Sequence, residues 1–223
     1  MTKNAPPRTA FPMMTLAIAG AVAAVSLTAC VPLVIGGAMV GGTLIAIDRR
    51  TSGAQLEDEG IELRAASRVR SNVGDRVHVN VTSYNRQVLI TGEVPNEQDK
   101  LRVGQIVSRV ENVGTIVNEL AVLGNSTLAQ RSSDVLVTGR IKAALIDTKD
   151  LISSAFKVVT ERGTVYLMGR VTAREADRAT AIARGTSGVQ KVVRVFENIS
   201  EEELTRMTPA PAKPDANKTA PAN

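Results

Sequence analysis

Hydrophobic and polar positions follow the same order twice along the chain. Residues 81–92 and 158–169 each read as an alternating strand, a polar turn, a second apolar strand and a closing glycine, at an offset of 77 residues. Farther on, Ile106 and Ile182 correspond at an offset of 76. An offset kept to within one residue over so long a stretch predicts a duplicated domain.

The first copy predicts a helix, two strands, a second helix and a third strand. Apolar positions at helical spacing favour a helix over 61–73, and alternating positions favour strands over 78–83 and 87–91. Asn96 is typical of the start of the next helix. The strand that closes the unit is expected over 115–123.

The second copy repeats this order. We expect Ser133 to cap its first helix and the middle of 156–168 to form a hairpin turn. Thr172 and Glu175 have capping-box spacing for the second helix, and 189–199 supplies the last strand. We therefore predict an α+β fold of two tandem αββαβ domains, each with two helices packed on a three-stranded sheet.

The N-terminal region has the pattern of a secretory signal. Two basic residues precede an apolar, uncharged run over 13–25, and small residues then lead to Cys30. Residues 27–30, Leu-Thr-Ala-Cys, resemble the bacterial lipobox. That resemblance implies cleavage before Cys30, which would carry diacylglycerol and an N-acyl chain such as palmitate. Val31 stands where an aspartate would resemble an inner-membrane retention signal, which favours the outer membrane. The alternative is an uncleaved membrane helix in which Cys30 is merely buried.

An apolar, glycine-rich stretch follows over 31–47. Gly37 and Gly41 have the small-xxx-small spacing that lets membrane helices approach closely. Two interpretations stay open: a flexible tether on the bilayer, or a short helix that inserts and self-associates as an oligomer or pore. The arginines within 48–50 are expected at the lipid headgroups.

Composition and charge narrow the classes of function. The chain has no tryptophan and 2% aromatic residues, so a stacking surface for single-stranded nucleic acid is poorly supplied. Residues 57–123 contain 8 Lys and Arg against 10 Asp and Glu, a net charge of −2, whereas 131–199 contain 12 against 7, a net charge of +5. A basic domain beside a bilayer is attracted to anionic lipid. The alternative is that its basic residues only solvate an outer helix face.

The sequence offers no constellation of residues suited to catalysis. His78 is the only histidine and Cys30 the only cysteine, so a transition-metal centre is not expected, and His78 is interpreted as an exposed residue at a strand edge. The acidic residues 57–59 are explained by a helix start. We predict a protein that is not an enzyme and carries no cofactor besides the acyl chains on Cys30.

Each repeat resembles a BON domain, with a glycine closing the central strand at Gly92 and Gly169. Together with the lipobox, residues 48–58 and 165–176 make the whole chain resemble the dual-BON outer-membrane lipoproteins associated with cell division and outer-membrane stress. The expected division is a signal peptide at 1–29, a lipidated Cys30 and tether at 30–56, BON domains at 57–123 and 131–199, and a disordered tail at 200–223.

The resemblance also implies a site for anionic phospholipid on the second domain. Carried to this sequence, the site comprises Leu136, Val137, Arg140 and Ile146 on the first helix, with Gly169, Arg170 and Val171 on the central strand. Leu136 departs from the family pattern, which has a tryptophan suited to the bilayer interface. Leucine can still insert, but it lacks headgroup-level anchoring.

The resemblance implies a lipid-anchored protein of the outer membrane that faces the periplasm and maintains envelope integrity. Its expected partners are anionic phospholipids of the inner leaflet, and no nucleic acid. The alternative is a periplasmic scaffold or chaperone-like protein that contacts the outer-membrane protein assembly machinery or cell-wall and division factors.

Overall fold

The structure, a computed structural model, describes residues 48–207. The predicted signal peptide, Cys30, the glycine-rich stretch and the tail beyond residue 207 lie outside the described residues. The described part belongs to one compact unit, Ile45–Asn223. No helix between residues 48 and 207 is long and apolar enough to cross a membrane.

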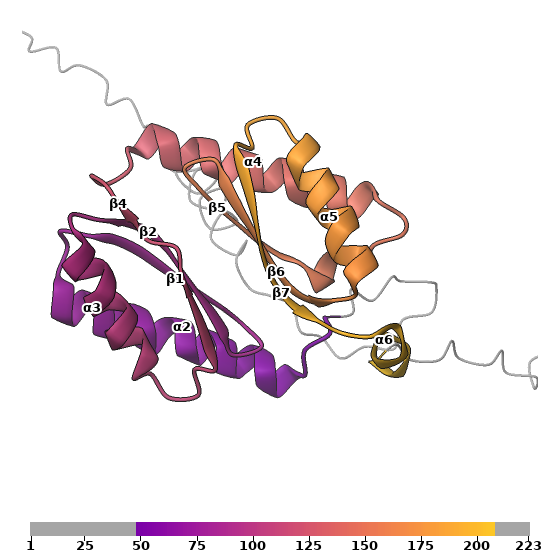
Figure 1. Ribbon diagram of the computed structural model, residues 1–223, viewed down its shortest axis with the longest axis horizontal. Coiled ribbons are helices and arrows are strands. Elements are labelled where there is room, and N and C mark those ends of the chain that lie inside the picture. Colours follow the sequence, from indigo (N-terminus) through magenta and orange to yellow (C-terminus); the bar gives the residue numbers. More distant parts are fainter. Residues whose placement is uncertain (1–47, 208–223) are drawn as a thin grey trace, which may run out of the picture. The chain divides into compact units, whose positions relative to one another are not determined.

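The first domain places two helices on one face of a mixed sheet (Figure 1). Its elements are α2 (Ser52–Val73), β1 (His78–Tyr84), β2 (Gln87–Val94), α3 (Glu97–Ser108), β3 (Thr115–Asn118) and β4 (Ala121–Val122). Strand β2 is central, because β1 pairs with it in antiparallel fashion while β3 and β4 both pair with it in parallel. The third strand expected over 115–123 is therefore split into two short strands.

The second domain has the same order of elements, with a short 3-10 turn before its hairpin (Figure 1). They are α4 (Leu128–Asp147), η2 (Ser153–Ala155), β5 (Lys157–Glu161), β6 (Thr164–Val171), α5 (Ala173–Gly185) and β7 (Lys191–Asn198), followed by α6 (Glu201–Met207). Here β6 is central, paired antiparallel with β5 and parallel with β7. The predicted α+β fold of two tandem domains is confirmed.

Each domain buries an apolar core between its helices and its sheet. In the first domain Val88 and Ile90 of β2 meet Ile61 of α2 and Val103 of α3. The second core repeats this arrangement around Leu167 of β6. Because the central strand is covered by both helices, its apolar positions are among the least exposed in the described chain.

A third apolar cluster joins the opposite faces of the two sheets. It contains Tyr84 and Leu89 from the first domain with Tyr166, Met168 and Val195 from the second. Successive side chains of a strand point to opposite faces, so these residues alternate with those that face the helices. The central strands are thus buried on both faces, which explains why they read as nearly continuous apolar runs.

A buried aspartate on the first helix of each domain holds the following hairpin turn. Asp58 accepts hydrogen bonds from the backbone N–H groups of Asn85 and Arg86, at 2.7 and 2.8 Å, and from the hydroxyl of Ser83. Asp134 accepts in the same way from both residues of the second turn. Asp58 was assigned to a helix start, but it lies inside α2 with its carboxylate turned to the sheet.

The predicted helix starts are confirmed in two cases and wrong in two others. The Asn96 side chain accepts from Asp99, and Thr172 forms a capping box with its partner three residues on, as expected. However, α4 is capped by Thr127 rather than Ser133, which lies inside the helix. Helix α2 begins at Ser52, within the segment assigned to the tether, because the Thr51 hydroxyl caps it.

The sequence predicted a disordered segment after β7, but the start of this segment is ordered. Residues Glu201–Met207 form α6, whose first turn is held by Ser200, since the Ser200 hydroxyl oxygen accepts from the backbone N–H of Glu203. The carboxylate of Glu203 also reaches Arg170 on β6. A local cap and an ion pair to β6 therefore hold a helix where composition alone predicted none.

Candidate functional site

The outer face of α4 is apolar although it is not covered by the rest of the described chain. Leu136 is 61% exposed and Ile146 is 68% exposed, and Arg140 lies between them on the exposed surface of the helix. Val137 is only 2% exposed and packs in the core with Ile141, so its side chain is not available to a lipid. Three of the four helix residues predicted for the site therefore reach the surface.

The two first helices can be compared position by position at an offset of 76. The buried residues Asp58 and Ile61 of α2 correspond to Asp134 and Val137 of α4. On the outer face Glu57, Glu59 and Gly60 of α2 become Ser133, Val135 and Leu136 of α4. In the opposite direction, the exposed Leu56 and Leu63 become Ser132 and Gly139. The buried positions keep their character, whereas α4 has no carboxylate at the positions of Glu57 and Glu59.

This difference changes the surroundings of a matched pair of arginines. Arg64 of α2 donates to the carboxylate of Glu57 at 2.6 Å, and reaches the carbonyl oxygen of Glu111 at 3.5 Å. Arg140 donates to the equivalent carbonyl, that of Ser187, at 3.2 Å. Within residues 48–207 Arg140 forms no ion pair. Its guanidinium keeps donors free for an anion.

A shallow hollow of about 180 Å³ lies at the C-terminal end of the same helix. It is lined by Lys142, Leu145, Ile146, Ser153, Ser154 and Phe156. Mostly apolar walls with one ammonium group at the edge suit a ligand that is apolar at one end and anionic at the other.

The strand residues predicted for the site are not part of an open surface. Gly169 is buried, and a Cβ there would collide with the carbonyl oxygen of Ala155, so glycine permits the close approach of η2 to β6. Val171 is fully buried. The guanidinium of Arg170 is held by Glu197 and Glu203, each at 2.8 Å. The contacts of Arg170 lead to β7 and α6, not to the outer face of α4.

The arginines that precede α2 are structural and do not reach out to headgroups as the sequence suggested. Arg49 is buried and makes a two-pronged ion pair with Glu175 of α5, at 2.6 and 2.8 Å. It also donates to the carbonyl oxygen of Arg170 at 2.8 Å. Arg50 pairs with Asp48 and Asp58 and lies over the ring of Tyr84.

The pKa of Glu175 reflects this pairing. Burial by itself would raise its pKa, but the guanidinium of Arg49 and the backbone N–H of Thr172 outweigh burial and lower it. The carboxylate is therefore charged at neutral pH and serves both as a helix cap and as the partner of Arg49. The segment in front of the first domain is thus bound to the second.

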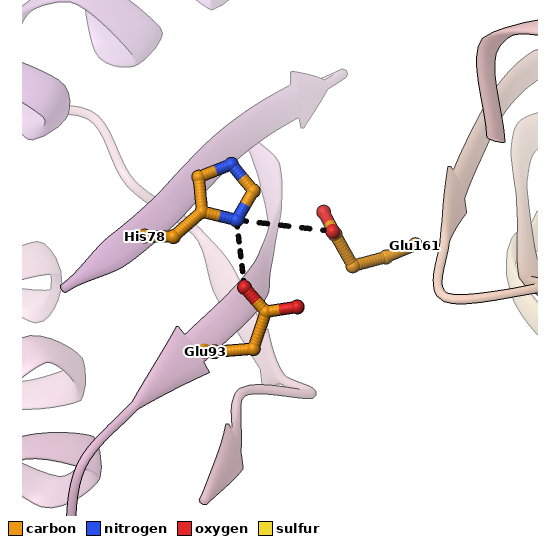
Figure 2. A group of neighbouring side chains, drawn as sticks. All are labelled: His78, Glu93 and Glu161. Atoms are coloured by element: carbon orange, nitrogen blue, oxygen red, sulfur yellow. Dashed lines mark hydrogen bonds and ion pairs between the residues drawn. The ribbon is translucent and has the colours of Figure 1, made fainter. Parts of the chain in front are cut away.

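His78 starts the edge strand β1, as predicted, but it is not exposed, because it lies between two buried carboxylates (Figure 2). Its Nδ1 is 2.8 Å from Glu93 and 3.8 Å from Glu161. Burial opposes charge on Glu93, but hydrogen bonds from His78 and Ser126 outweigh it and lower the pKa of Glu93. Burial raises the pKa of Glu161, although Asn80 donates to it at 3.0 Å.

The BON domain family matches this chain twice, over residues 58–124 and 133–197. The chain is 36% identical over 177 residues to the outer membrane lipoprotein DolP of Haemophilus influenzae, a match that covers 78% of this chain and 91% of that protein. The chain belongs to the dual-BON family of outer-membrane lipoproteins.

Two further proteins are similar at lower levels. A 21 kDa hemolysin of Actinobacillus pleuropneumoniae is 30% identical over 155 residues, which cover 69% of this chain and 80% of that protein. A solved structure of CdsD, a structural protein of the type III secretion system of Chlamydia trachomatis, covers 70% of this chain and 99% of the solved chain at 12% identity and a TM-score of 0.27. A TM-score that low supports no inference about the fold.

Two features of this BON lipoprotein were missed from the sequence. The change from Glu57 to Ser133, which leaves Arg140 unpaired, could have been found by extending the repeat alignment into the first helices. The pair of Arg49 with Glu175 joins residues 126 positions apart and has no local signal. Only the folded chain brings its two partners together.

Proposed function

We propose that this BON lipoprotein is anchored to the outer membrane by acyl chains on Cys30, faces the periplasm and binds anionic phospholipid through α4 of its second domain. It acts without catalysis and maintains the integrity of the envelope, with a link to cell division. The observation that carries the proposal is the outer face of α4, where exposed Leu136 and Ile146 flank an arginine that has no acidic partner within the described residues.

The two kinds of side chain on this face complement each other at a bilayer surface. Leu136 and Ile146 can enter the boundary between headgroups and acyl chains, while Arg140 and Lys142 contact phosphate. Each basic residue near an anionic surface contributes about 1 kcal/mol. The outer face of α2 has Glu57 and Glu59 where α4 has Ser133 and Val135, and an anionic surface would repel these carboxylates.

The segment that leads from the proposed anchor also supports membrane contact by the second domain. Arg49 stands nineteen positions after Cys30 and is bound to Glu175 of the second domain. An acylated Cys30 would therefore keep this domain close to the bilayer and raise its effective concentration there. Even weak contacts by α4 would then be occupied most of the time.

Vesicle binding by a fragment without Cys30 tests the proposal. Residues 45–223 form one compact unit that contains all three apolar cores, so this fragment retains the fold. We expect it to float with vesicles containing phosphatidylglycerol or cardiolipin, to bind less at high salt, and not to float with phosphatidylcholine alone. Ser133→Glu should place a carboxylate beside Arg140, as Glu57 stands beside Arg64, and weaken binding roughly fivefold.

Matched variants in the first domain separate a specific effect from a general change in charge. Ser67→Glu adds the same charge on an exposed position of α2 and should leave binding nearly unchanged. Leu136→Glu should abolish flotation, whereas Leu63→Glu, at a residue 73% exposed, should not. If both members of each pair weaken flotation equally, or if the parent fragment does not float, the lipid-binding proposal fails. The periplasmic scaffold would then be the favoured function.

A further inference from the structure

His78, Glu93 and Glu161 place three potential metal ligands around one point (Figure 2). Nδ1 of His78 and one carboxylate oxygen of each glutamate all lie within 4.8 Å of one another. They come from three different strands, β1, β2 and β5, so two ligands belong to the first domain and one to the second. Metal sites are commonly built from such convergent side chains of distant segments.

The two carboxylates of the cluster are buried. The side chains of Glu93 and Glu161 are 0% and 9% exposed. Within the described residues the guanidinium that forms an ion pair with them is that of Arg162, 3.4 Å from Glu93. A buried carboxylate needs a compensating cation or hydrogen bonds on both oxygens.

Glu161 is the member that is least compensated. Its Oε2 accepts a hydrogen bond from Asn80 at 3.0 Å, but its Oε1 points toward Nδ1 of His78 from 3.8 Å, beyond hydrogen-bond distance. Among residues 48–207 no donor within hydrogen-bond distance reaches Oε1. The Glu161 side chain is 9% exposed, and its carboxylate is directed at the imidazole of His78 (Figure 2).

We propose that this cluster binds one Zn²⁺ ion through Nδ1 of His78, Oε2 of Glu93 and Oε1 of Glu161. The distances from Nδ1 to the two oxygens, 2.8 and 3.8 Å, bracket the separation of about 3.4 Å expected for ligands of tetrahedral zinc. The three ligand atoms lie within 4.8 Å of one another, so rotation of the glutamate side chains would draw them together around the ion. A hollow of about 240 Å³ beside His78 and Glu161 gives access from solvent.

The ligand types select the metal. One imidazole with two carboxylates suits zinc and its first-row neighbours, whereas Mg²⁺ and Ca²⁺ favour sites made of oxygen ligands alone. Asn80 donates to the other carboxylate oxygen of Glu161 at 3.0 Å and keeps that ligand oriented. A bound ion would join the two BON domains through direct bonds.

The composition of the 45–223 fragment makes the test unambiguous. It contains one histidine and no cysteine, so an untagged fragment can bind zinc by nitrogen only through His78. We expect saturable 1:1 binding of ZnCl₂ by calorimetry, a shift of the His78 Nδ1 resonance in ¹⁵N NMR, and no competition by MgCl₂. Loss of a supporting residue around a metal costs 10–100-fold in affinity, so loss of the ligand in Glu161→Gln should cost at least about tenfold.

A second carboxylate that bridges the domains provides the control. Glu62 pairs with Lys157 at 2.7 Å and lies outside the cluster, so Glu62→Gln should bind zinc as the parent does. His78→Gln should abolish binding, with NMR dispersion showing that the variant is folded. The proposal is overturned if Glu161→Gln binds as tightly as Glu62→Gln, or if zinc leaves the Nδ1 resonance unmoved.

Discussion

Single buried aspartates couple the helix of each BON domain to its hairpin. The turn at Asn85 and Arg86 has positive φ angles of 50° and 65°, a conformation that favours glycine but here holds two larger residues. The carboxylate of Asp58 accepts from both backbone N–H groups and so stabilises that turn. The second domain needs less help, because its turn contains Gly163 at φ 72°.

Asp58→Asn should therefore destabilise the protein at neutral pH. Burial alone would raise the pKa of Asp58, but hydrogen bonds from Ser83, Arg86 and Arg50 outweigh it and lower the pKa. A lowered pKa means that the stabilisation is present at neutral pH and is lost as pH falls through the folded-state value. Urea unfolding of the variant should show a loss of about 2 kcal/mol at pH 7, and a smaller difference from the parent below about pH 4.

The exposed neighbour Glu59 provides the control for this prediction. Glu59→Gln removes the same charge from the same helix without touching the turn and should change stability by less than about 0.5 kcal/mol. An Asp58→Asn loss that stayed constant from pH 7 to pH 3 would mean that the charge of Asp58 contributes nothing to folding.

At the scale of elements, periodicity in the sequence predicted the helices and strands of both repeats and their order. It misplaced ends that depend on a single side chain. Ser133 and Thr127 are equally plausible caps by residue type, and only the contact of Thr127 with Gln130 decides between them. Helix α6 was missed because its seven residues have no core-forming pattern, and it is held through Glu203 and Arg170.

The contact of α6 with β6 affects how much cationic surface the second domain presents. Glu203→Gln removes one of the two carboxylates that hold Arg170, so its guanidinium becomes more available to anionic lipid. We expect binding to phosphatidylglycerol vesicles to tighten by a few-fold, in keeping with about 1 kcal/mol per available basic residue. Stability should fall by less than about 1 kcal/mol, because the pair is partly exposed.

Glu201→Gln separates release of Arg170 from a general gain in positive charge. It makes the same charge change on the same helix, but its carboxylate lies 3.9 Å from Arg174, which is already exposed. If both variants tighten vesicle binding equally, Arg170 has no particular role. Arg170 would then drop out of the predicted lipid site, leaving the residues of α4.

At the scale of the whole described chain, contacts between the domains explain what the sequence could not predict. The repeat implied two independent domains, and their separate cores agree with that. The third cluster and the ion pair of Arg49 with Glu175 join residues far apart in the chain, and no periodic pattern records such pairs. His78 was read as an exposed residue because Glu93 lies on the neighbouring strand and Glu161 in the other domain, so neither partner is close to it in the sequence.

The pair of Arg49 and Glu175 yields the last prediction. Arg49→Ala leaves Glu175 buried without its partner, which typically costs about 3–5 kcal/mol. Replacing both residues by methionine removes both buried charges and should recover part of that loss, because the cap that Glu175 provides to the Thr172 N–H is also lost. Because the pKa of Glu175 is lowered in the folded state, the loss in Arg49→Ala should be full at pH 7 and shrink as pH falls below about 4.5.

Chemical denaturation of the parent, Arg49→Ala and the double methionine variant measures these differences, with Arg178→Ala as a control. Arg178 and Asp150 form an exposed pair at 3.6 Å, so its loss should cost less than about 1 kcal/mol. If Arg49→Ala cost no more than Arg178→Ala, the segment before α2 would not be fixed to the second domain. An acyl anchor at Cys30 would then lead directly only into the first domain, and the lipid contact by α4 would depend on its own affinity.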